Sequence, residues 1–365
     1  MWALGDVLMA TSMLSAIRSQ EPDTHVAWIV DSSHAALLDN HPLIDEVITV
    51  DSGAWRRLLR RGNLAGWLST AVRLNRELRA RRFDVVINCH PEKSWTAWLS
   101  AAPKRIALFH RPSSFLQKTP YTISVQRPVG SSRHFIDDYR AAVAAAGYAS
   151  DATSTSLGET DDERQFAEEF LVTAGIDNKG LIAVLAPFTS MENKSIDVDA
   201  CASIARWLVS ERGAGVVITG GPGDTAQGNE IVQRAGVDGV VFAEGTTLRQ
   251  YIGLLRRSDV VITADSSALH LAGALAKPYV ALFGPTDPTK LAPSAIPGAM
   301  PAALGRHVAP ATTLGRVLTN PIRCAPCELP TCANPIYKAC LRGIAQSEIQ
   351  EAIDLALASI PVPTT

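Results

Sequence analysis

The stretch 259–288 most strongly limits the folds open to this chain. It contains two short apolar runs, 260–263 and 279–283, separated by a helix-like segment. Two buried strands joined by a helix are typical of a parallel βαβ unit. The polar tripeptide Asp265-Ser266-Ser267 follows the first run. Because Ser or Asp at a helix start leaves first-turn N–H groups facing outward, this tripeptide predicts either a phosphate-binding cradle or a simple helix cap.

The same alternation of strands and helices recurs in both halves of the chain. Strands are predicted at 26–30, 47–50, 85–88 and 105–109, and then at 181–185, 215–219, 240–242, 260–263 and 279–283. A helical stretch is predicted over 55–78. A chain of 365 residues exceeds what one core usually supports. We therefore predict two domains, and the small polar segment 147–161 is the predicted linker.

The predicted fold class is α/β, with two Rossmann-like domains facing a central cleft. Residues 1–150 form the first domain, residues 151–345 the second, and residues 346–365 a C-terminal helix and tail, with the helix over 347–358. The first domain opens on a helical pattern at 7–18 with no apolar strand ahead of it. Since a doubly wound domain normally begins with a strand, either translation begins upstream of this sequence or the domain lacks its first strand.

Composition narrows the function classes. The net charge is −2 and 47% of the residues are hydrophobic, which gives no general drive towards nucleic acid. The sequence has neither the continuous apolar run of a membrane span nor the pattern of a signal peptide. We expect a cytoplasmic protein with no nucleic-acid partner.

Five motifs, in order along the chain, resemble glycosyltransferase family 9, the heptosyltransferases built on a GT-B scaffold. They are Leu4–Thr11, then 28–30 with 41–48, then Gly220–Asp224, Asp265–His270 and Phe283–Pro288. The resemblance covers nearly the whole chain. It implies an inverting enzyme that moves a heptose from ADP-heptose to a lipopolysaccharide inner-core acceptor, with no cofactor required for transfer.

The resemblance also implies roles for residues on the two sides of the transfer. Asp6, at the tip of the first loop, is the implied general base for the attacking sugar hydroxyl, and its alternative is a helix N-cap. Lys194 is implied to neutralise the departing diphosphate, with Thr189 and Ser190 as phosphate hydrogen-bond donors. The alternative for Lys194 is a solvated loop lysine. The family often has Trp where this chain has Ile196.

Further donor-binding residues follow from the later motifs. Asp265, Ser266 and His270 fall where the family binds the diphosphate and the donor sugar, and Ser267 stands where the family commonly has glycine. The alternatives are a helix cap and a packed histidine. Asp224 is placed near the ribose hydroxyls, and the hydroxyls of Thr246 and Thr247 near the adenine or ribose. A simple turn and helix caps are the alternatives there.

A basic segment lies in the first half of the chain. Residues 56–82 contain nine arginines and one acid, Glu77. Guanidinium groups suit an acceptor rich in carboxylates and phosphates, and they also suit peripheral contact with an anionic membrane surface. A solvated helix face is the alternative. The acceptor-binding residues that we predict are Arg56, Arg57, Arg60, Arg61 and Lys93.

Four of the six cysteines cluster near the C-terminus, namely Cys324, Cys327, Cys332 and Cys340. Their number and the leading Cys-x-x-Cys pair suit a structural zinc ion, although the spacing is not that of a standard zinc finger. The other interpretation is a structural segment without metal. A disulfide is disfavoured in the cytosol.

Two other functions remain open from the sequence. An epimerase of the GT-B scaffold shares the nucleotide-binding loops, but it acts on the donor alone and has no use for a basic acceptor face. A catalytically silent nucleotide-sugar-binding protein is compatible with Ile196 and Ser267.

Overall fold

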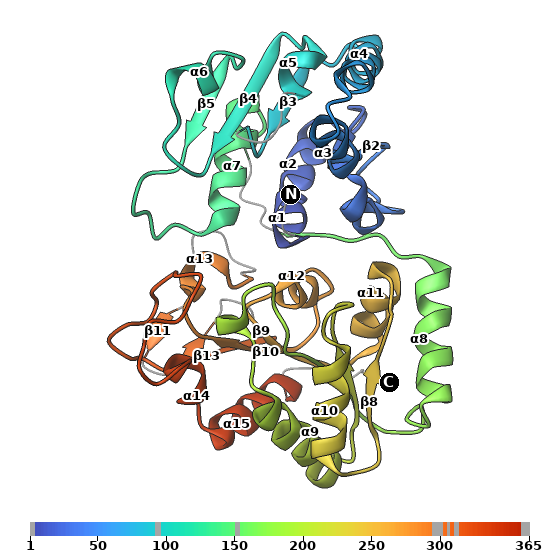
Figure 1. Cartoon of the computed structure of the whole chain (residues 1–365), viewed down its shortest axis with the longest axis vertical. Coiled ribbons are helices and arrows are strands. Elements are labelled where there is room, and N and C mark those ends of the chain that lie inside the picture. The colour runs from blue at the N-terminus through green and yellow to red at the C-terminus, as the bar shows by residue number, and fades with distance from the viewer. Residues whose placement is uncertain are drawn as a thin grey trace. The chain divides into compact units, whose positions relative to one another are not determined.

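The computed structural model describes residues 4–91, 96–149, 154–293, 302–304, 307–309 and 314–358. The chain divides into two compact units, Met1–Ser156 and Leu157–Thr365. The boundary therefore lies inside the predicted linker, after Ser156 rather than after residue 150. Each unit has its own helices and its own parallel strands (Figure 1).

The N-terminal unit contains two parallel sheets. One pairs β1 (Ala27–Asp31) with β2 (Glu46–Val50), and the other has the order β3 (Val85–Asn88), β4 (Lys104–Phe109), β5 (Ile123–Gln126). The helices of this unit are α1 (Leu4–Ala10), α2 (Ser12–Gln20), the 3₁₀ helix η1 (Ser32–Leu38), α3 (Ser52–Arg60), α4 (Leu64–Ala80), α5 (Thr96–Ser100), α6 (Phe115–Lys118) and α7 (Phe135–Ala146). The four predicted strands of this half are present. The short edge strand β5, half-buried and alternating with polar residues, was not predicted.

The main core of this unit lies between α1, α2 and α7 on one side and β3 and β4 on the other. Met9 and Met13 pack there against Ile106 and Leu108 of β4. Tyr139 of α7 is fully buried in the same cluster. The residues ahead of Leu4 lie outside the described ranges, so the question of a first strand stays open.

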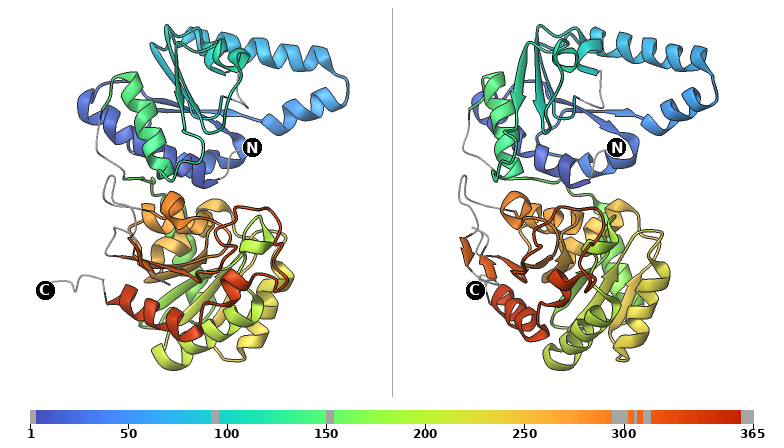
Figure 2. Two further views of the ribbon diagram at one scale, coloured as in Figure 1. Left: turned by 90° about the vertical axis from the view of Figure 1, so that its left-hand side faces the viewer. Right: turned by 60° about the vertical axis from the view of Figure 1, so that its left-hand side comes forward.

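The predicted helix over 55–78 is a helical hairpin. The first helix, α3, ends before Gly62, whose φ of 68° is in the left-handed region that favours glycine. Asn63 then caps α4, since its side-chain oxygen accepts a hydrogen bond from Gly66 N at 2.8 Å. The rings of Trp55 and Trp67 meet edge to face, with centroids 6.1 Å apart, and hold the two helices together. The hairpin extends away from the sheets of its unit (Figure 2).

The C-terminal unit contains one sheet of order β11-β12-β13-β10-β9-β6-β7-β8. Its strands are β6 (Ile182–Ala186), β7 (Gly215–Thr219), β8 (Val240–Ala243), β9 (Val260–Ala264), β10 (Tyr279–Phe283), β11 (Ala302–Leu304), β12 (His307–Ala309) and β13 (Gly315–Thr319). Its helices are α8 (Asp161–Thr173), the 3₁₀ helix η2 (Glu192–Lys194), α9 (Val198–Arg212), α10 (Thr225–Ala235), α11 (Leu248–Arg257), α12 (Ser267–Ala274), α13 (Pro288–Leu291), α14 (Ala339–Arg342) and α15 (Gln346–Leu357). The strands from β6 to β10, with β13, are parallel.

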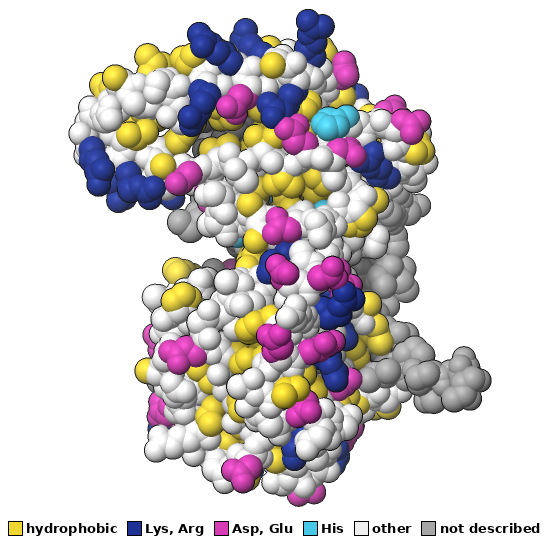
Figure 3. Space-filling view, turned by 90° about the vertical axis from the view of Figure 1, so that its right-hand side faces the viewer, with side chains coloured by type: hydrophobic (Ala, Val, Ile, Leu, Met, Phe, Trp, Pro, Cys, Tyr) yellow, Lys and Arg dark blue, Asp and Glu magenta, His cyan; other side chains and the backbone are white. Residues whose placement is uncertain are grey.

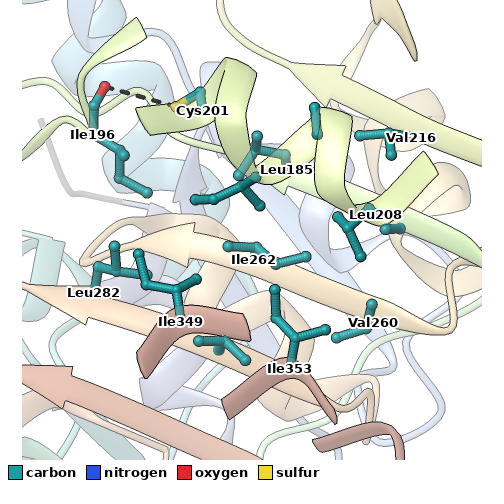
Figure 4. Close-up of a cluster of buried hydrophobic side chains, with 14 of the residues drawn as sticks. Leu185, Ile196, Cys201, Leu208, Val216, Val260, Ile262, Leu282, Ile349 and Ile353 are labelled. Atoms are coloured by element: carbon teal, nitrogen blue, oxygen red, sulfur yellow. Dashed lines mark hydrogen bonds between the residues drawn. The ribbon is translucent and has the colours of Figure 1, made fainter. Parts of the chain in front are cut away.

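Strands β6, β7, β9 and β10 are buried along their whole length, which explains their continuous apolar sequences. Ile349 and Ile353 of α15 are buried in the same hydrophobic cluster as Ile262 and Leu282 (Figure 4). The C-terminal helix is therefore part of this core. A helix was predicted over 347–358, and the structure has one at Gln346–Leu357, packed into the core of the C-terminal unit.

Helices α8 and α11 pack closely around a buried carboxylate. Glu163, whose side chain is fully buried, accepts hydrogen bonds from Arg249 and Arg256, both at 3.0 Å. The helices approach so closely that a Cβ atom added at Gly253 would lie 2.2 Å from the Glu163 carbonyl oxygen. Only glycine fits at this position.

We predict that Gly253→Ala destabilises the C-terminal unit by about 1–3 kcal/mol, because the backbone of α8 must move to admit the methyl group. Thermal unfolding measures the effect as a lower midpoint. The control is Gly180→Ala, since a Cβ atom at Gly180 meets no neighbouring atom within 4 Å. Equal midpoints for Gly253→Ala and the wild type would show that the helices are not held at this distance.

Candidate functional site

The candidate residues of the C-terminal unit all follow the carboxyl ends of its parallel strands. The chain runs outward through β6, β7 and β8, then returns to place β9 on the other side of β6. The point between β6 and β9 is a topological switch point, and open α/β sheets bind ligands outside the strand ends there. The loop after β6 carries Lys194, and the loop after β9 carries Asp265. These two residues flank the switch point.

Lys194 and Asp265 form the central contact of this edge. The Lys194 ammonium donates to Asp265 Oδ2 at 2.7 Å, and the side chains are 17% and 5% exposed. The hydroxyl of Thr286, from the loop after β10, donates to the same oxygen at 2.7 Å. Three loops therefore meet at one buried carboxylate. Thr286 lies in the Phe283–Pro288 motif but was not predicted to be a site residue.

The loop after β6 has its own internal hydrogen bonds. Thr189 Oγ1 donates to the carbonyl of Met191 at 2.6 Å, and Thr189 N donates to Ser195 Oγ at 3.0 Å. Ser190 is exposed. The Thr189 hydroxyl is therefore used in folding the loop, and Ser190 offers an exposed hydroxyl next to it.

The segment that follows β13 forms hydrogen bonds with this loop. The buried Lys338 donates to the carbonyl of Ser195 at 2.8 Å and pairs with Asp197 at 2.5 Å. The amide of Asn193 donates to the carbonyl of Leu329 at 2.9 Å. The backbone on both sides of Lys194 is thus anchored to residues 329–338.

The start of α12 combines a cap with available polar groups. Ser266 is the N-cap, because its hydroxyl accepts a hydrogen bond from Ala268 N at 3.2 Å. Its Oγ also lies 3.1 Å from Thr263 Oγ1. Ser267 is the first helical residue, and His270 lies one turn further on, half-buried. The cap interpretation of Ser266 is therefore true, and it is compatible with anion binding by the first turn.

The remaining donor-side predictions lie at the same edge of the sheet. Asp224 Oδ2 accepts a hydrogen bond from Gly221 N at 2.7 Å and closes the turn after β7. Thr247 is the N-cap of α11 in a capping box with Gln250. Thr246 precedes it and is half-buried. Asp224 and Thr247 therefore each have a local structural role, and nothing in their contacts assigns a ligand to them.

In the N-terminal unit, Asp6 lies in the first turn of α1 and is half-buried. The sequence predicted that Asp6 lies at the tip of a loop, and this prediction is wrong. The spacing of Leu4, Val7 and Leu8 is helical, and α1 runs through Gly5 and Asp6. Burial raises the pKa of Cys89 to about 12, and the charge of Asp6 adds to it.

The charge of Asp6 also affects the pKa values of Tyr139 and His34. Burial and, second, the charge of Asp6 raise the pKa of Tyr139 in α7. Burial lowers the pKa of His34 in η1, against the charges of Asp31 and Asp6. In keeping with this, helix α1 packs against η1 and α7, and its Met9 lies in the same core cluster as Cys89, which follows β3.

The arginines of residues 56–82 are all exposed. Within the described structure, ion pairs engage Arg57 with Asp51 and Arg81 with Glu46. Leu64, Leu68 and Val72 form an exposed apolar row along α4, at 65%, 57% and 41% exposure. The visible face of the N-terminal unit shows Lys and Arg side chains among hydrophobic ones (Figure 3). Lys93 lies outside the described residues.

The four cysteines near the C-terminus are free thiols. Cys324 Sγ accepts a hydrogen bond from the Asn334 amide at 3.2 Å, and Cys332 Sγ accepts one from Lys338 N at 3.4 Å. Among the described residues, no group of three or more His, Cys, Asp or Glu side chains is gathered closely enough to hold a metal ion. The zinc ion stays a prediction. The segment contacts the Lys194 loop through Leu329 and Lys338, and it contacts the loop after β10, where Glu328 N donates to the carbonyl of Pro285 at 2.7 Å.

Two α/β units, each with parallel strands and with polar loops at the carboxyl ends of those strands, are the architecture of the GT-B fold. The model of glycosyltransferase family 9 (heptosyltransferase) matches residues 71–300. The chain belongs to this family and is a glycosyltransferase.

The individual relatives have low sequence identity to this chain, but the similarity covers most of its length. The chain is 23% identical over 297 residues to the lipopolysaccharide core heptosyltransferase OpsX of Haemophilus influenzae, covering 80% of this chain and 79% of the relative. The fold is similar to that of a family 9 glycosyltransferase from Veillonella parvula, with a TM-score of 0.76, 22% identity, and 99% and 96% of the two chains covered. It is also similar to E. coli ADP-heptose lipopolysaccharide heptosyltransferase II, with a TM-score of 0.69, 18% identity, and 98% and 96% covered.

The ion pair of Asp197 with Lys338, which anchors the Lys194 loop, makes a pH-dependent contribution to the free energy of unfolding. Burial alone would raise the pKa of Asp197, but the hydrogen bonds from Lys338 and Arg342 outweigh it and lower the pKa below its usual 3.8. A lowered folded-state pKa stabilises the fold above the unfolded-state pKa, and this stabilisation is lost as the pH falls through the folded-state value.

We predict that Asp197→Asn lowers the free energy of unfolding at pH 7 by about 1–3 kcal/mol, because Lys338 loses its charged partner. The difference from wild type should shrink as the pH falls below 3.8, the usual pKa. Denaturant titrations at pH 7 and at about pH 3 measure it. The control is Asp199→Asn, at an exposed ion pair with Arg234. A difference that does not change with pH would contradict the assignment.

Proposed function

We propose that this protein transfers a heptose from ADP-heptose to a hydroxyl of a lipopolysaccharide inner-core acceptor, with inversion at the anomeric carbon. The observation that carries the proposal is the meeting of Lys194, Asp265 and Thr286 at the switch point of the C-terminal sheet. The relatives support it, since OpsX is a lipopolysaccharide core heptosyltransferase and the E. coli enzyme is an ADP-heptose lipopolysaccharide heptosyltransferase.

The C-terminal unit binds the donor in this proposal. Lys194 neutralises the diphosphate, and Asp265 holds the ammonium in position before the donor arrives. An ammonium group has three N–H donors, so the bond to Asp265 leaves others for phosphate oxygens. Ser190 and the first turn of α12, at Ser267, add hydrogen-bond donors. Charge that develops on the leaving ADP is stabilised by groups already in place, without a metal ion.

The N-terminal unit binds the acceptor, whose hydroxyl is the nucleophile, and supplies the base. Asp6 accepts the proton of the acceptor hydroxyl as that oxygen attacks the anomeric carbon, while the bond from that carbon to the ADP oxygen breaks. The neighbouring Tyr139 and Cys89 are neutral at physiological pH, because their pKa values are raised. Neither of these two groups can then accept the proton as an anion, and the base in this proposal is Asp6.

The α3–α4 hairpin is the proposed contact with acceptor and membrane. Arg56, Arg57, Arg60 and Arg61 are exposed at the bend of the hairpin, beside the apolar row of α4. Charge attracts this surface to anionic lipid and to the charged acceptor, while apolar side chains enter the lipid interface. None of the helices in the described ranges has the length and apolar character to cross a membrane.

We predict that Asp6→Asn lowers kcat by about 10²- to 10⁴-fold, because the proton acceptor is lost. Release of ADP from ADP-heptose in the presence of a heptose-free acceptor measures the rate. The dissociation constant for ADP should not change. Asp23→Asn, at an exposed position of the same unit, is the control. Undiminished ADP release by Asp6→Asn would sink the assignment of the base.

We predict that Arg60→Ala combined with Arg61→Ala weakens binding to phosphatidylglycerol vesicles by about tenfold or more, at about 1 kcal/mol per charge. Arg257→Ala combined with Arg323→Ala, exposed arginines of the C-terminal unit, is the matched control. Co-sedimentation at low and high salt measures binding. KM for a soluble, delipidated acceptor tells acceptor binding from lipid binding. Equal sedimentation of both double variants would contradict the membrane contact.

The same assays separate the rival functions. A panel of ADP- and UDP-sugars identifies the donor, and failure of every ADP-sugar would overturn the donor assignment. Release of a free, altered sugar without acceptor would indicate an epimerase. Binding of ADP-heptose with no turnover under any acceptor would indicate a silent binding protein.

A further inference from the structure

Helix α6 (Phe115–Lys118) presents two large apolar side chains to solvent. Phe115 is 81% exposed and Leu116 is 78% exposed, which is more than any residue of the apolar row on α4. Exposed apolar side chains that are scattered singly need no explanation, but two large ones side by side form a candidate interaction surface. We therefore examined what holds this helix and what surrounds it.

Hydrogen bonds keep α6 in a defined position. Ser114 N donates to Gln117 Oε1 at 2.8 Å, and Gln117 N donates to Ser114 Oγ at 3.4 Å, which together form a capping box. Ser113 Oγ donates to Gln126 Oε1 of β5 at 3.2 Å and ties the start of the helix to the sheet. The two apolar side chains are thus held in solvent by a closed and anchored helix.

The segment around α6 is basic. Residues 104–136 contain six Lys and Arg residues and neither Asp nor Glu. Arg111, which is exposed, and Lys118, which is half-buried, lie on either side of the apolar pair in the sequence. Apolar side chains flanked by cations bind anionic lipid surfaces, because insertion and charge attraction act together. The surroundings of α6 therefore favour a negatively charged lipid surface as its partner.

The size of the apolar pair disfavours a protein partner. Burial of an aromatic side chain removes about 150–250 Å² from water, whereas a stable protein interface buries about 800 Å² on each partner. A second copy of this chain would therefore gain too little area here for a stable dimer. A lipid surface sets no such minimum, since each inserted side chain leaves water independently.

Two neighbouring helices carry exposed apolar residues at the same end of the N-terminal unit. Helices α4, α5 and α6 lie together at this end, which is at the top in Figure 1. Trp98 of α5 is 63% exposed, and Leu64 and Leu68 of α4 are 65% and 57% exposed. Tryptophan is enriched at membrane interfaces, because its ring is apolar and its N–H group is polar. A lipid surface at this end would meet apolar residues of three helices.

We propose that Phe115 and Leu116 insert into an anionic lipid surface, with Arg111 and Lys118 against the lipid headgroups. The inference rests on the proposed function, in which the N-terminal unit contacts a membrane, and deepens it. Salt screens the attraction of the hairpin arginines to lipid, but it does not screen apolar insertion. Helix α6 is therefore the salt-resistant part of the contact, and the α3–α4 hairpin is the salt-sensitive part.

The test is co-sedimentation of the full chain with phosphatidylglycerol vesicles at about 0.1 M and 1 M salt. One variant combines Phe115→Ala with Leu116→Ala, and a second combines Phe115→Trp with Leu116→Trp, which keeps large side chains suited to the interface. The matched control combines Val172→Ala with Leu355→Ala, two exposed apolar positions of the C-terminal unit. Thermal unfolding checks that each variant is folded, and sedimentation velocity without vesicles measures its oligomeric state.

We expect the alanine variant to bind vesicles at least tenfold more weakly at both salt concentrations, and the tryptophan variant and the control to bind as the wild type does. Equal binding by the alanine variant, or a loss confined to low salt, would overturn the proposal. Failure of the tryptophan variant to bind would overturn it as well. A wild-type dimer that the alanine substitutions dissociate would assign the surface to a second copy of this chain instead.

Release of ADP with a soluble, delipidated acceptor should be the same for the wild type and all three variants, because α6 is not placed in the transfer site. If the wild type itself released no ADP from ADP-heptose, the proposed function would fail while the vesicle result stayed readable. If transfer were normal and the alanine variant bound vesicles like the wild type, the inference about α6 alone would fail.

Discussion

The complete burial of the central strands is the constraint on which the C-terminal unit depends. Strands β6, β7, β9 and β10 have helices on both faces and carry apolar side chains at nearly every position. Polar groups are therefore confined to the strand ends, and the switch point between β6 and β9 brings two of those ends together. The Lys194–Asp265 contact is a consequence of this topology, and Thr286 extends it to the next strand.

The segment after β13, as well as the sheet, holds the Lys194–Asp265 contact in place. A loop that carries a cation for a ligand must be fixed before the ligand arrives, or the ordering cost weakens binding. Here Lys338 and Asn193 tie the loop to the segment after β13, and Asp197 supplies the charge that keeps Lys338 buried. The cysteine-containing segment thus contacts the candidate site through the backbone of Ser195.

The sequence predicted the strands better than the contacts. Strands β7 and β10 were predicted with their observed bounds, because fully buried strands read as unbroken apolar runs. The break between α3 and α4 was missed, although Gly62-Asn63 is a stop signal followed by a cap. The pairing of Lys194 with Asp265 was not predicted, since residues 71 positions apart meet only through the strand order. The sequence indicated a loop at Asp6, but the helical spacing of the neighbouring apolar residues places Asp6 in α1.

The two units differ in how completely their parallel strands are paired. In the C-terminal unit every strand from β6 to β10 has its ladder partners, and the residues after β6 and β9 are fixed by hydrogen bonds between loops. In the N-terminal unit the ladder is interrupted between β1 and β3, at a cavity beside α1. Asp6 lies in the first turn of that same helix, which packs against α7 and η1. A base must be held within hydrogen-bond reach of its proton, so the packing of α1 against these two helices decides where Asp6 can act.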